Sequence, residues 1–362
     1  MSLYLLAAGG TGGHLFPAEA LAHELIGRGH TVHLATDERV ERYSGSFPAE
    51  RIHTVPSATF GSRNPIAVAR AGWTLFRGMR ATRRLLREIR PAAVVGFGGY
   101  PTIPPMLVAA SGGFPAMIHE ANGVMGRANK LLAPRVTAIA GGFLKVEGPY
   151  ASKMTRTGNP VRPAVLEAAK EPYGPSGEGQ PFHLLVFGGS QGASFFGEAV
   201  PDAVANLPAE LRNRLRIVQQ SRPEDESAIR ERYAELDVEV EVAPFFSDLP
   251  SRIASAHLVV SRSGASTVSE VATIGRPAIL VPLPHALDQD QAVNAAGFEA
   301  EGGAILAPQS ELTGSRLGDM LEAAMREPDR LAQMAASAKT VGHADAARRL
   351  ADLAESIARK GD

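Results

Sequence analysis

Two features of the sequence predict an α/β protein made of two Rossmann-like domains that face each other across a cleft. Short apolar runs alternate with helical patterns through most of the 362 residues, as in parallel sheets covered by helices. An apolar strand also runs into a glycine-rich turn and then a helix twice, near Leu3 and again near His183. A chain of this length can bury a sizeable core in each domain.

The composition is that of a soluble α/β protein, with 44% hydrophobic residues, 21% charged residues and a net charge of −1. This balance gives no reason to expect a nucleic-acid partner. Because the chain has no cysteine, disulfides, thiolate metal sites and a cysteine nucleophile are excluded. No apolar run approaches the ~18 residues of a membrane span, and the first residues lack the basic start of a signal peptide. We therefore expect a cytoplasmic protein.

The first strand is expected at Leu3–Ala8, and the glycine-rich turn Gly9–His14 follows it. A helix with one apolar face and a second strand, Val32–Ala35, complete a βαβ opening. The turn does not match the dinucleotide motif, because leucine stands where that motif needs glycine, and no lysine follows as in a P-loop. It offers instead close backbone approach and a histidine at the carboxyl edge of the sheet, where α/β folds bind ligands.

The segment Ile66–Arg90 has the spacing of an amphipathic helix, with Val68 and Leu86 on its apolar face. Between positions 63 and 90 there are eight arginines and one acid, and two aromatic residues fall among the arginines. An arginine-rich face is usually a solvated surface, but aromatic residues within it are typical of helices that touch anionic lipid. We therefore predict that this face contacts a membrane. Its members are Trp73, Phe76, Arg77, Arg80 and Arg84.

Three more strands are expected in the first half, at Ala92–Phe97, Pro115–Ile118 and Val136–Ala140, the last of this domain. The first of them ends in a glycine turn, and the second ends in the sequence His119–Asn122. That sequence is not the zinc motif H-E-x-x-H, because position 123 is glycine. Several polar strand ends that converge on one edge of a sheet predict a ligand-binding cleft.

Glycine and proline mark the boundary between the two domains. We predict an N-terminal domain at 1–160, a linker at 161–182, a C-terminal domain at 183–345, and a final helix at 346–362 that packs back on the first domain. The strands expected in the C-terminal domain are His183–Phe187, Arg216–Gln219, Val238–Ala243, Leu258–Val260 and Ala278–Val281.

The most informative stretch is Ser261–Glu270, a turn between an apolar strand and a short helix that Gly275 closes. Unpaired N–H groups and the helix dipole at such a start favour an anion, typically a phosphate. Glu270 lies one to two turns further on, where a carboxylate can accept hydrogen bonds from both hydroxyls of a ribose. Together these features would hold a nucleotide. The alternative is an ordinary capped helix with a surface glutamate.

Two other motifs suggest different chemistry. Gly188, Ser190 and Gly192 match the nucleophile elbow of serine hydrolases, and Asp288 and His343 would complete a triad. The alternative is a second backbone cradle in which Ser190 donates to a phosphate. The sequence Asp288-Gln289-Asp290 is similar to a paired-aspartate metal motif, but acids at a helix start also stabilise the helix dipole. We rank both motifs below the nucleotide site and expect neither a cofactor nor a metal site.

Together the motifs resemble the N-acetylglucosaminyltransferases of peptidoglycan synthesis that act on a lipid-linked muramyl acceptor. The resemblance implies a GT-B type fold and an inverting transferase at the cytoplasmic face of the inner membrane. The donor would be UDP-N-acetylglucosamine, and the acceptor the 4-hydroxyl of undecaprenyl-diphosphate-linked N-acetylmuramyl-pentapeptide. The matching segments span about residues 3 to 300 and are Gly9–His14, Gly98–Tyr100, His119–Asn122, Gly158–Arg162, Gly188–Gly192, Ser263–Glu270, Gln291 and Asn294.

Carried over by position, the resemblance implies that the second domain holds most of the donor. The diphosphate would contact Ser190 and the amides at the start of the helix. The ribose would contact Glu270, and the uracil would contact the backbone near Phe246. The sugar would contact Gln291. The first domain would add its glycine turn and Asn122, with Arg162 at the hinge. All the residues expected to contact substrate are Thr11, Gly12, Gly13, Asn122, Arg162, Ser190, Phe246, Ala265, Ser266, Thr267, Val268, Ser269, Glu270 and Gln291.

Inversion by a single displacement needs a base for the proton of the attacking hydroxyl. His14 fits this role because an imidazole titrates near neutrality, and Glu120 is the rival because burial can raise the pKa of a carboxylate. This chain departs from the family at Ala121, often glutamine, and at Asp290, often an amide or histidine. Other functions stay open: a sugar-nucleotide epimerase, a transferase with another acceptor, a serine hydrolase, and a non-catalytic nucleotide-sugar-binding protein.

Overall fold

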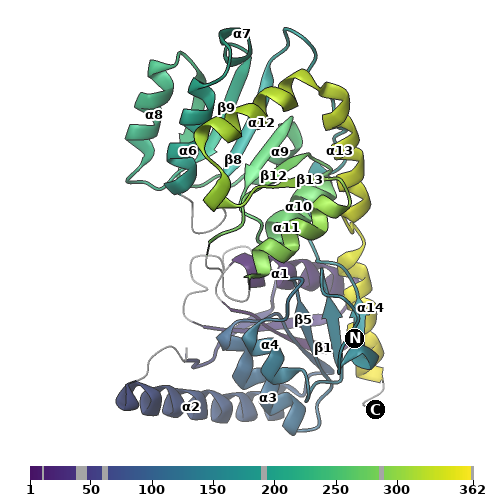
Figure 1. Cartoon of the computed structure of the whole chain (residues 1–362). Helices are drawn as coiled ribbons and strands as arrows, with labels where there is room; N and C mark the ends of the chain where they lie inside the picture. The colour runs from purple at the N-terminus through teal and green to yellow at the C-terminus, as the bar shows by residue number, and fades with distance from the viewer. Residues whose placement is uncertain (10–11, 38–46, 59–63, 189–193, 285–288, 360–362) are drawn as a thin grey trace. The chain divides into compact units, whose positions relative to one another are not determined.

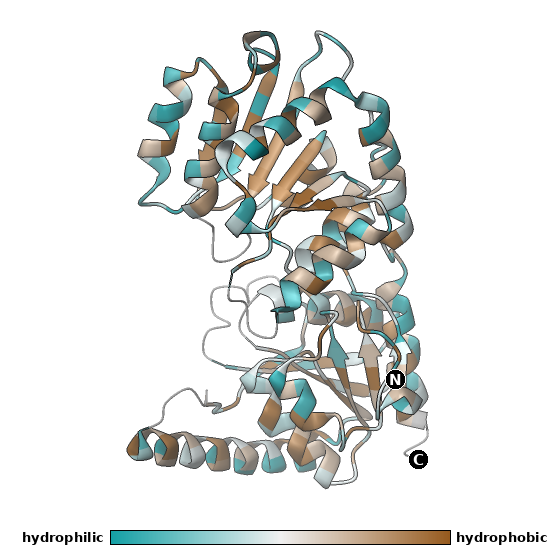
Figure 2. Cartoon of the chain, viewed as in Figure 1, coloured by the Kyte–Doolittle hydropathy of each residue, from teal (hydrophilic) through white to brown (hydrophobic). Residues whose placement is uncertain are grey.

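The computed structural model describes residues 1–9, 12–37, 47–58, 64–188, 194–284 and 289–359 (Figure 1). The chain forms two compact units, one of Met1–Arg162 with Ala344–Asp362 and the other of Pro163–His343. Each unit has one parallel β-sheet flanked by helices, which confirms the predicted class of two α/β domains. The strands of both sheets are largely hydrophobic, whereas the helices alternate hydrophobic and hydrophilic positions (Figure 2).

The sheet of the first unit has seven strands in the order β3-β2-β1-β4-β5-β6-β7, and all neighbours are parallel. The strands are β1 (Leu3–Ala7), β2 (Thr31–Thr36), β3 (Arg51–Thr54), β4 (Ala93–Gly96), β5 (Ala116–Glu120), β6 (Ala138–Gly141) and β7 (Met154–Arg156). The helices are α1 (Gly12–Gly27), α2 (Pro65–Ile89), α3 (Ile103–Ser111), α4 (Arg127–Leu132) and α14 (Ala346–Arg359). The strand order reverses between β1 and β4, so the turns that follow these two strands are neighbours at the carboxyl edge.

Helix α14, the end of the chain, packs against α1 of the first unit (Figure 1). Its apolar residues, such as Leu350 and Ala354, are buried in the same core as Leu21 and Leu25 of α1. At the rim, Arg28 forms ion pairs of 2.8 Å with Asp352 and 3.3 Å with Glu355. The apolar contacts provide most of the attachment, since ion pairs at this degree of exposure contribute little.

The sheet of the second unit has six parallel strands in the order β10-β9-β8-β11-β12-β13. The strands are β8 (Phe182–Phe187), β9 (Leu215–Gln220), β10 (Glu239–Ala243), β11 (Leu258–Ser261), β12 (Ala278–Leu280) and β13 (Ala304–Leu306). The helices are α5 (Pro163–Ala168), α6 (Ser194–Ala205), α7 (Ala209–Arg212), α8 (Glu226–Glu235), α9 (Leu249–Ser255), α10 (Ala265–Ile274), α11 (Asp290–Ala300), α12 (Gly314–Arg326) and α13 (Pro328–Val341). Here the order reverses between β8 and β11.

Three strands were not predicted: β3, β7 and β13. Each lies at an edge of its sheet and is only three or four residues long. β3 (Arg-Ile-His-Thr) and β7 (Met-Thr-Arg) are partly exposed and lack the apolar run of a buried parallel strand, whereas β13 (Ala-Ile-Leu) is apolar but only three residues long. The expectation that Val136–Ala140 contains the last strand of the first domain is therefore wrong. The segment predicted as a linker also contains α5, which belongs to the second unit.

The fully buried residues of helix α2 all lie in its second half. Its buried residues are Gly78, Thr82 and Leu86, whereas Val68, expected on the packed face, is 47% exposed. Gly78 lies directly against the backbone carbonyl of Pro56, where a side chain would collide. The first half of the helix thus exposes apolar residues that the amphipathic pattern alone would have buried.

We predict opposite effects for alanine at the two interior glycines of α2. Gly78→Ala should destabilise the protein by roughly 1–3 kcal/mol, because the methyl group overpacks against Pro56. Gly72→Ala should stabilise it by ~0.5–1 kcal/mol, since alanine is the better helix former and nothing lies within 4 Å of the added methyl. Urea unfolding of both variants measures the difference. Equal effects would mean that Gly78 does not set the packing of α2.

Candidate active site

His14 lies among three glycines at the carboxyl edge of the first sheet. It is the third residue of α1 and is half-buried. A methyl group added at Gly98 would lie 3.2 Å from the imidazole Nε2, and one at Gly9 or Gly99 would lie 3.4 Å from Nδ1. Gly98 and Gly99 also have φ values of 93° and 79°, which favour glycine. The turns after β1 and β4 therefore make room for this side chain and fix its place.

The Glu120 carboxylate, at the end of β5, accepts four hydrogen bonds. Its Oε1 accepts from the backbone N of Asn122 at 3.1 Å and from Asn122 Nδ2 at 3.2 Å. Its Oε2 accepts from Gly126 N and from Asn129 Nδ2, both at 2.9 Å. The buried carboxylate thus ties the loop after β5 to the start of α4. Because both oxygens are engaged in this way, Glu120 is a weaker candidate base than His14.

His119, the residue before Glu120, is fully buried and has a structural role. Its Nε2 lies 3.3 Å from the carbonyl oxygen of Gly158, and its ring packs beside Phe97. Burial lowers the pKa of His119 to about 4, so the imidazole is neutral near pH 7. The contact joins the end of β5 to the segment that leads to Arg162.

Arg162 packs against the start of α1. Its guanidinium carbon lies 3.9 Å from the centroid of the Phe16 ring, which is within cation–π distance. Phe16 in turn covers Gly12, where an added methyl would lie 3.0 Å from the ring. The predicted residues Gly12, His14 and Arg162 are therefore brought together around α1, while Asn122 is held by Glu120. Gly13, which is exposed, follows Gly12 in the first turn of α1.

In the second unit, helix α10 begins at the carboxyl end of β11 with free capacity to donate hydrogen bonds. Its N-cap is Gly264, which has no side chain that could cap the N–H groups of Ala265, Ser266 and Thr267. Among the described residues, the buried hydroxyl of Ser266 has no hydrogen-bond partner. Glu270, four residues after Ser266, shares its helix face and is only 6% exposed. Helix α10 thus carries, in order from its start, the first-turn amides, the hydroxyl of Ser266 and the carboxylate of Glu270.

The other predicted residues of α10 face its own unit. Val268 is fully buried, and the hydroxyl of Ser269 donates to the carbonyl of Ala265 at 2.7 Å. Phe246 is also buried, with the guanidinium of Arg252 4.4 Å above its ring. Its neighbour Phe245, which sequence reasoning missed, is 70% exposed after the carboxyl end of β10. The only sequence signal for Phe245 was its place just after an expected strand.

Gln291 is held at the start of α11 by contacts on both sides. Its Oε1 accepts from Leu283 N at 3.0 Å, and its carbonyl accepts from Ser263 Oγ at 2.8 Å. Asn294 Nδ2 donates to the carbonyl of Ser263 at 3.2 Å. Because Oε1 accepts from the backbone, a ligand beside Gln291 would meet its Nε2 donor. Gln291 is therefore tied to the turn that opens α10.

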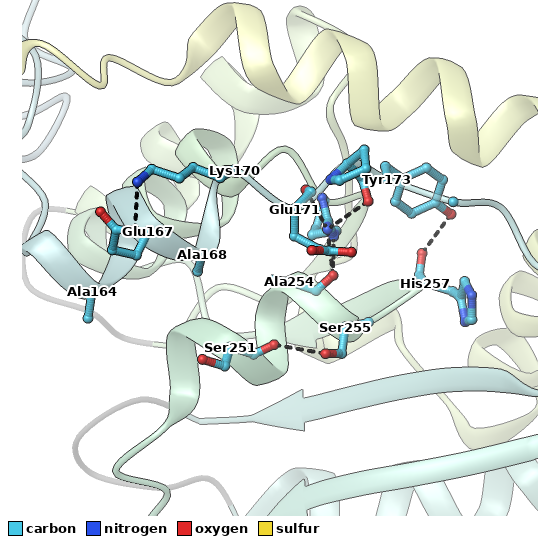
Figure 3. Close-up of a pocket in the computed structure, with 14 residues that line it drawn as sticks. Ala164, Glu167, Ala168, Lys170, Glu171, Tyr173, Ser251, Ala254, Ser255 and His257 are labelled. Carbon is cyan, nitrogen blue, oxygen red and sulfur yellow. Dashed lines mark hydrogen bonds and ion pairs between the residues drawn. The ribbon is translucent and has the colours of Figure 1, made fainter.

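A groove of about 680 Å³ lies at the opposite, amino edge of this sheet (Figure 3). It is bordered by α5, the segment after α5 and α9, and Tyr173 donates from its hydroxyl to the carbonyl of His257 at 3.0 Å. Burial, with smaller effects of His183, Arg276 and Arg214, lowers the pKa of His257 to about 4. None of the predicted site residues lines this groove.

Three predicted residues, Thr11, Ser190 and Asp288, lie outside the described residues. His343 of the proposed hydrolase triad follows Gly342, which packs on Thr273 near the end of α10. Asp290 accepts from Gln291 N at 2.8 Å, as an acid at a helix start does.

Over the described ranges, no group of three or more His, Cys, Asp or Glu residues is arranged to hold a metal ion. In the same part of the chain, no helix is both long and apolar enough to cross a bilayer.

Comparisons with known proteins identify the chain's relatives. The family models of the glycosyltransferase family 28 N-terminal and C-terminal domains match residues 4–141 and 183–350. A UDP-N-acetylglucosamine--N-acetylmuramyl-(pentapeptide) pyrophosphoryl-undecaprenol N-acetylglucosamine transferase from a Chelativorans species is 63% identical, over 98% of this chain and 95% of its own. The namesake from Sinorhizobium medicae is 62% identical, over 98% and 96% of the two chains.

Among solved structures, that of Acinetobacter baumannii MurG is similar, with a TM-score of 0.77 and 27% identity over 98% of this chain and 99% of that one. Two parallel-sheet α/β domains with these relatives define a glycosyltransferase of the GT-B fold class. The chain belongs to glycosyltransferase family 28.

The buried His119 predicts a loss of stability in acid. Its folded pKa of about 4 lies below the ~6.5 of an unfolded histidine. The unfolded chain therefore binds the proton first, so the contribution of His119 is complete above pH ~6.5 and is lost as the pH falls toward 4. The loss from this residue should reach about 3 kcal/mol. Urea unfolding between pH 7 and 4.5 should show a smaller loss for His119→Gln than for the wild type.

His257→Gln is the matched control, because its burial has the same consequence in the second unit. It should remove a separate part of the pH dependence of the unfolding free energy, so the reductions caused by the two substitutions should add. A His119→Gln protein with the wild-type pH dependence would contradict the assignment.

Proposed function

We propose that this protein transfers N-acetylglucosamine from UDP-N-acetylglucosamine to an undecaprenyl-diphosphate-linked N-acetylmuramyl-pentapeptide, a step of peptidoglycan synthesis. The observation that carries the proposal is the identity of 59–63% to transferases of that name over 98–99% of the chain. At this level of identity, the residues that select both substrates are expected to be retained along with the fold.

Helix α10 supplies the chemistry for the donor. We assign the diphosphate to the first-turn amides and the Ser266 hydroxyl, where the helix dipole also favours an anion. We assign the ribose to Glu270, because a buried carboxylate gains from two hydroxyl donors. Gln291 then meets the sugar through its Nε2 donor. Phe245, exposed after β10, offers an aromatic face to the uracil.

The transfer is a single displacement with inversion. The acceptor 4-hydroxyl oxygen forms a bond to the anomeric carbon of N-acetylglucosamine, while the bond from that carbon to the diphosphate oxygen breaks. The electron pair of the broken bond leaves with UDP, and the amides at the start of α10 stabilise the added charge. The hydroxyl proton goes to a base, which we assign to His14 in its glycine pocket, whereas Glu120 positions Asn122.

A serine hydrolase is the one alternative outside the transferases that a sequence motif, the nucleophile elbow, suggests. We set it aside because the models of glycosyltransferase family 28 match both halves of the chain.

The function is tested by incubating the protein with both substrates and following the disaccharide-linked lipid and UDP by mass spectrometry. We expect both products in equal amounts. UDP release without a disaccharide, or binding without turnover, would contradict the proposal.

Replacement of the proposed base should affect turnover and spare donor binding. We expect His14→Ala to lower kcat ~10²–10⁴-fold, the usual effect of losing a general base, while UDP-N-acetylglucosamine affinity changes little. His23→Ala, on the exposed side of the same helix, is the control and should leave kcat unchanged. If His14→Ala keeps near-normal turnover and Glu120→Gln loses it, the base is Glu120.

We also propose that the exposed face of α2, which carries Trp73, Phe76, Arg77, Arg80 and Arg84, docks on an anionic membrane. Trp73 and Phe76 are 63% and 49% exposed, and their rings stack with centroids 5.7 Å apart. Arg77, Arg80 and Arg84 are exposed on the same helix. An aromatic pair that inserts between headgroups, bordered by cations, is the pattern of an interfacial helix. This location would place the enzyme next to its lipid-linked acceptor.

Charge reversal should therefore release the protein from vesicles. Each arginine near an anionic surface contributes about 1 kcal/mol, so Arg77→Glu, Arg80→Glu and Arg84→Glu together should weaken binding at least ~100-fold at low salt. The control reverses three exposed arginines of the second unit, Arg222, Arg316 and Arg330, with the same change in net charge. Sedimentation with phosphatidylglycerol vesicles measures both. Equal losses would mean that net charge, rather than α2, directs binding.

A further inference from the structure

Arg262 is a buried cation at the carboxyl edge of the second sheet that none of the roles above uses. It follows β11 directly and is 6% exposed. Its Nη1 donates to the carbonyls of Val281 at 3.1 Å and Pro282 at 3.2 Å, and its Nη2 donates to Gln309 Oε1 at 2.6 Å. Burying a guanidinium is unfavourable unless its surroundings compensate, so this position calls for an explanation.

The contacts of Arg262 join the segments that follow four neighbouring strands. Val281 and Pro282 follow β12, and Gln309 follows β13. The rings of Phe195 and Phe196, at the start of the helix after β8, lie with their centroids 5.6 and 5.1 Å from the guanidinium carbon. Arg262 itself follows β11. One side chain therefore connects the carboxyl ends of β8, β11, β12 and β13.

Both sides of Arg262 lead to Gln291. On one side, the next residue, Ser263, donates to the Gln291 carbonyl and accepts from Asn294. On the other, Pro282 is followed by Leu283, whose N–H donates to Gln291 Oε1. The guanidinium therefore closes a ring of contacts that begins and ends at Gln291, and it fixes the distance between the start of α10 and the side-chain amide of Gln291.

We propose that Arg262 is a positioning residue for the donor sugar: it holds Gln291 at a set distance from the diphosphate-binding start of α10. The inference rests on the proposed function, because it assumes that α10 binds the diphosphate and Gln291 the sugar. Of these two parts, UDP contacts the start of α10 but not Gln291, whereas UDP-N-acetylglucosamine contacts both. Loss of Arg262 should therefore weaken the binding of the sugar nucleotide more than the binding of UDP.

Arg276 provides a matched control for burial. It is 1% exposed and donates to backbone carbonyls, among them those of Ala254, Ile274 and Glu171. These groups lie at the amino edge of the same sheet, beside the groove of Figure 3. Arg276 is thus a buried, carbonyl-bound arginine of the same unit that contacts the C-terminal end of α10 but none of the residues assigned to the donor. A purely structural role for Arg262 would make both arginines behave alike.

The test is a set of double-mutant cycles read by calorimetry with UDP and with UDP-N-acetylglucosamine. The single variants are Arg262→Lys, Arg276→Lys and Gln291→Ala, and each lysine change is also combined with Gln291→Ala. Lysine keeps the charge but cannot make the separate bonds of the guanidinium fork. We expect Arg262→Lys to weaken sugar-nucleotide binding roughly 10-fold and UDP binding less than ~3-fold, as for residues of one hydrogen-bond network.

The combination of Arg262→Lys with Gln291→Ala should then be no weaker than Gln291→Ala alone, within ~2-fold. Arg276→Lys should lower the melting temperature and leave the ratio of the two affinities unchanged. Gln309→Ala, which removes one anchor and keeps Arg262, should shift that ratio in the same direction to a smaller extent.

The inference is overturned if the effects of Arg262→Lys and Gln291→Ala multiply, if UDP and the sugar nucleotide lose affinity equally, or if Gln309→Ala leaves the ratio unchanged. A wild-type protein that fails to bind UDP-N-acetylglucosamine would overturn the proposed function itself. If the wild-type protein binds the sugar nucleotide and transfers N-acetylglucosamine, but the effects of Arg262→Lys and Gln291→Ala on affinity multiply, only the role of Arg262 is overturned.

Discussion

The constraint on which the molecule depends is that every strand of each sheet runs in the same direction. Parallel pairing sends the loops of successive strands to a single edge, and the reversal of strand order opens a space between two of those loops. In the first unit this space holds His14 between the turns after β1 and β4. In the second it holds the start of α10, after β11. Both sets of candidate residues are thus consequences of strand direction and order.

Buried charges then organise the loops that strand order brings together. Glu120 accepts three hydrogen bonds from the loop after β5 and one from Asn129 of α4, and Arg262 donates to segments after β12 and β13. A loop at the carboxyl edge has backbone groups that no strand pairs, so a charged side chain with several donors or acceptors can satisfy them in one place. The first unit uses a carboxylate and the second unit a guanidinium to bind these backbone groups.

Much of this arrangement was predictable, because buried strands and glycine turns leave local patterns. The turn Gly9–His14 and the stretch Ser261–Glu270 both indicate ligand sites from the sequence alone. The edge strands β3 and β7 were missed because their exposed positions carry polar residues, and β13 because its apolar run is only three residues long. Arg262 was missed for a different reason. Its hydrogen-bond partners Val281, Pro282 and Gln309 are 19 to 47 positions away, and all three bonds depend on strand order rather than on spacing in the sequence.

The place of α14 has a consequence for how the chain folds during synthesis. The first unit needs this helix to cover apolar residues of α1, yet α14 is synthesised only after the whole of the second unit. The second unit, Pro163–His343, is complete before α14 appears. Part of the core of the first unit must therefore stay uncovered until the second unit has been synthesised. This order is opposite to the usual one, in which the N-terminal domain folds first.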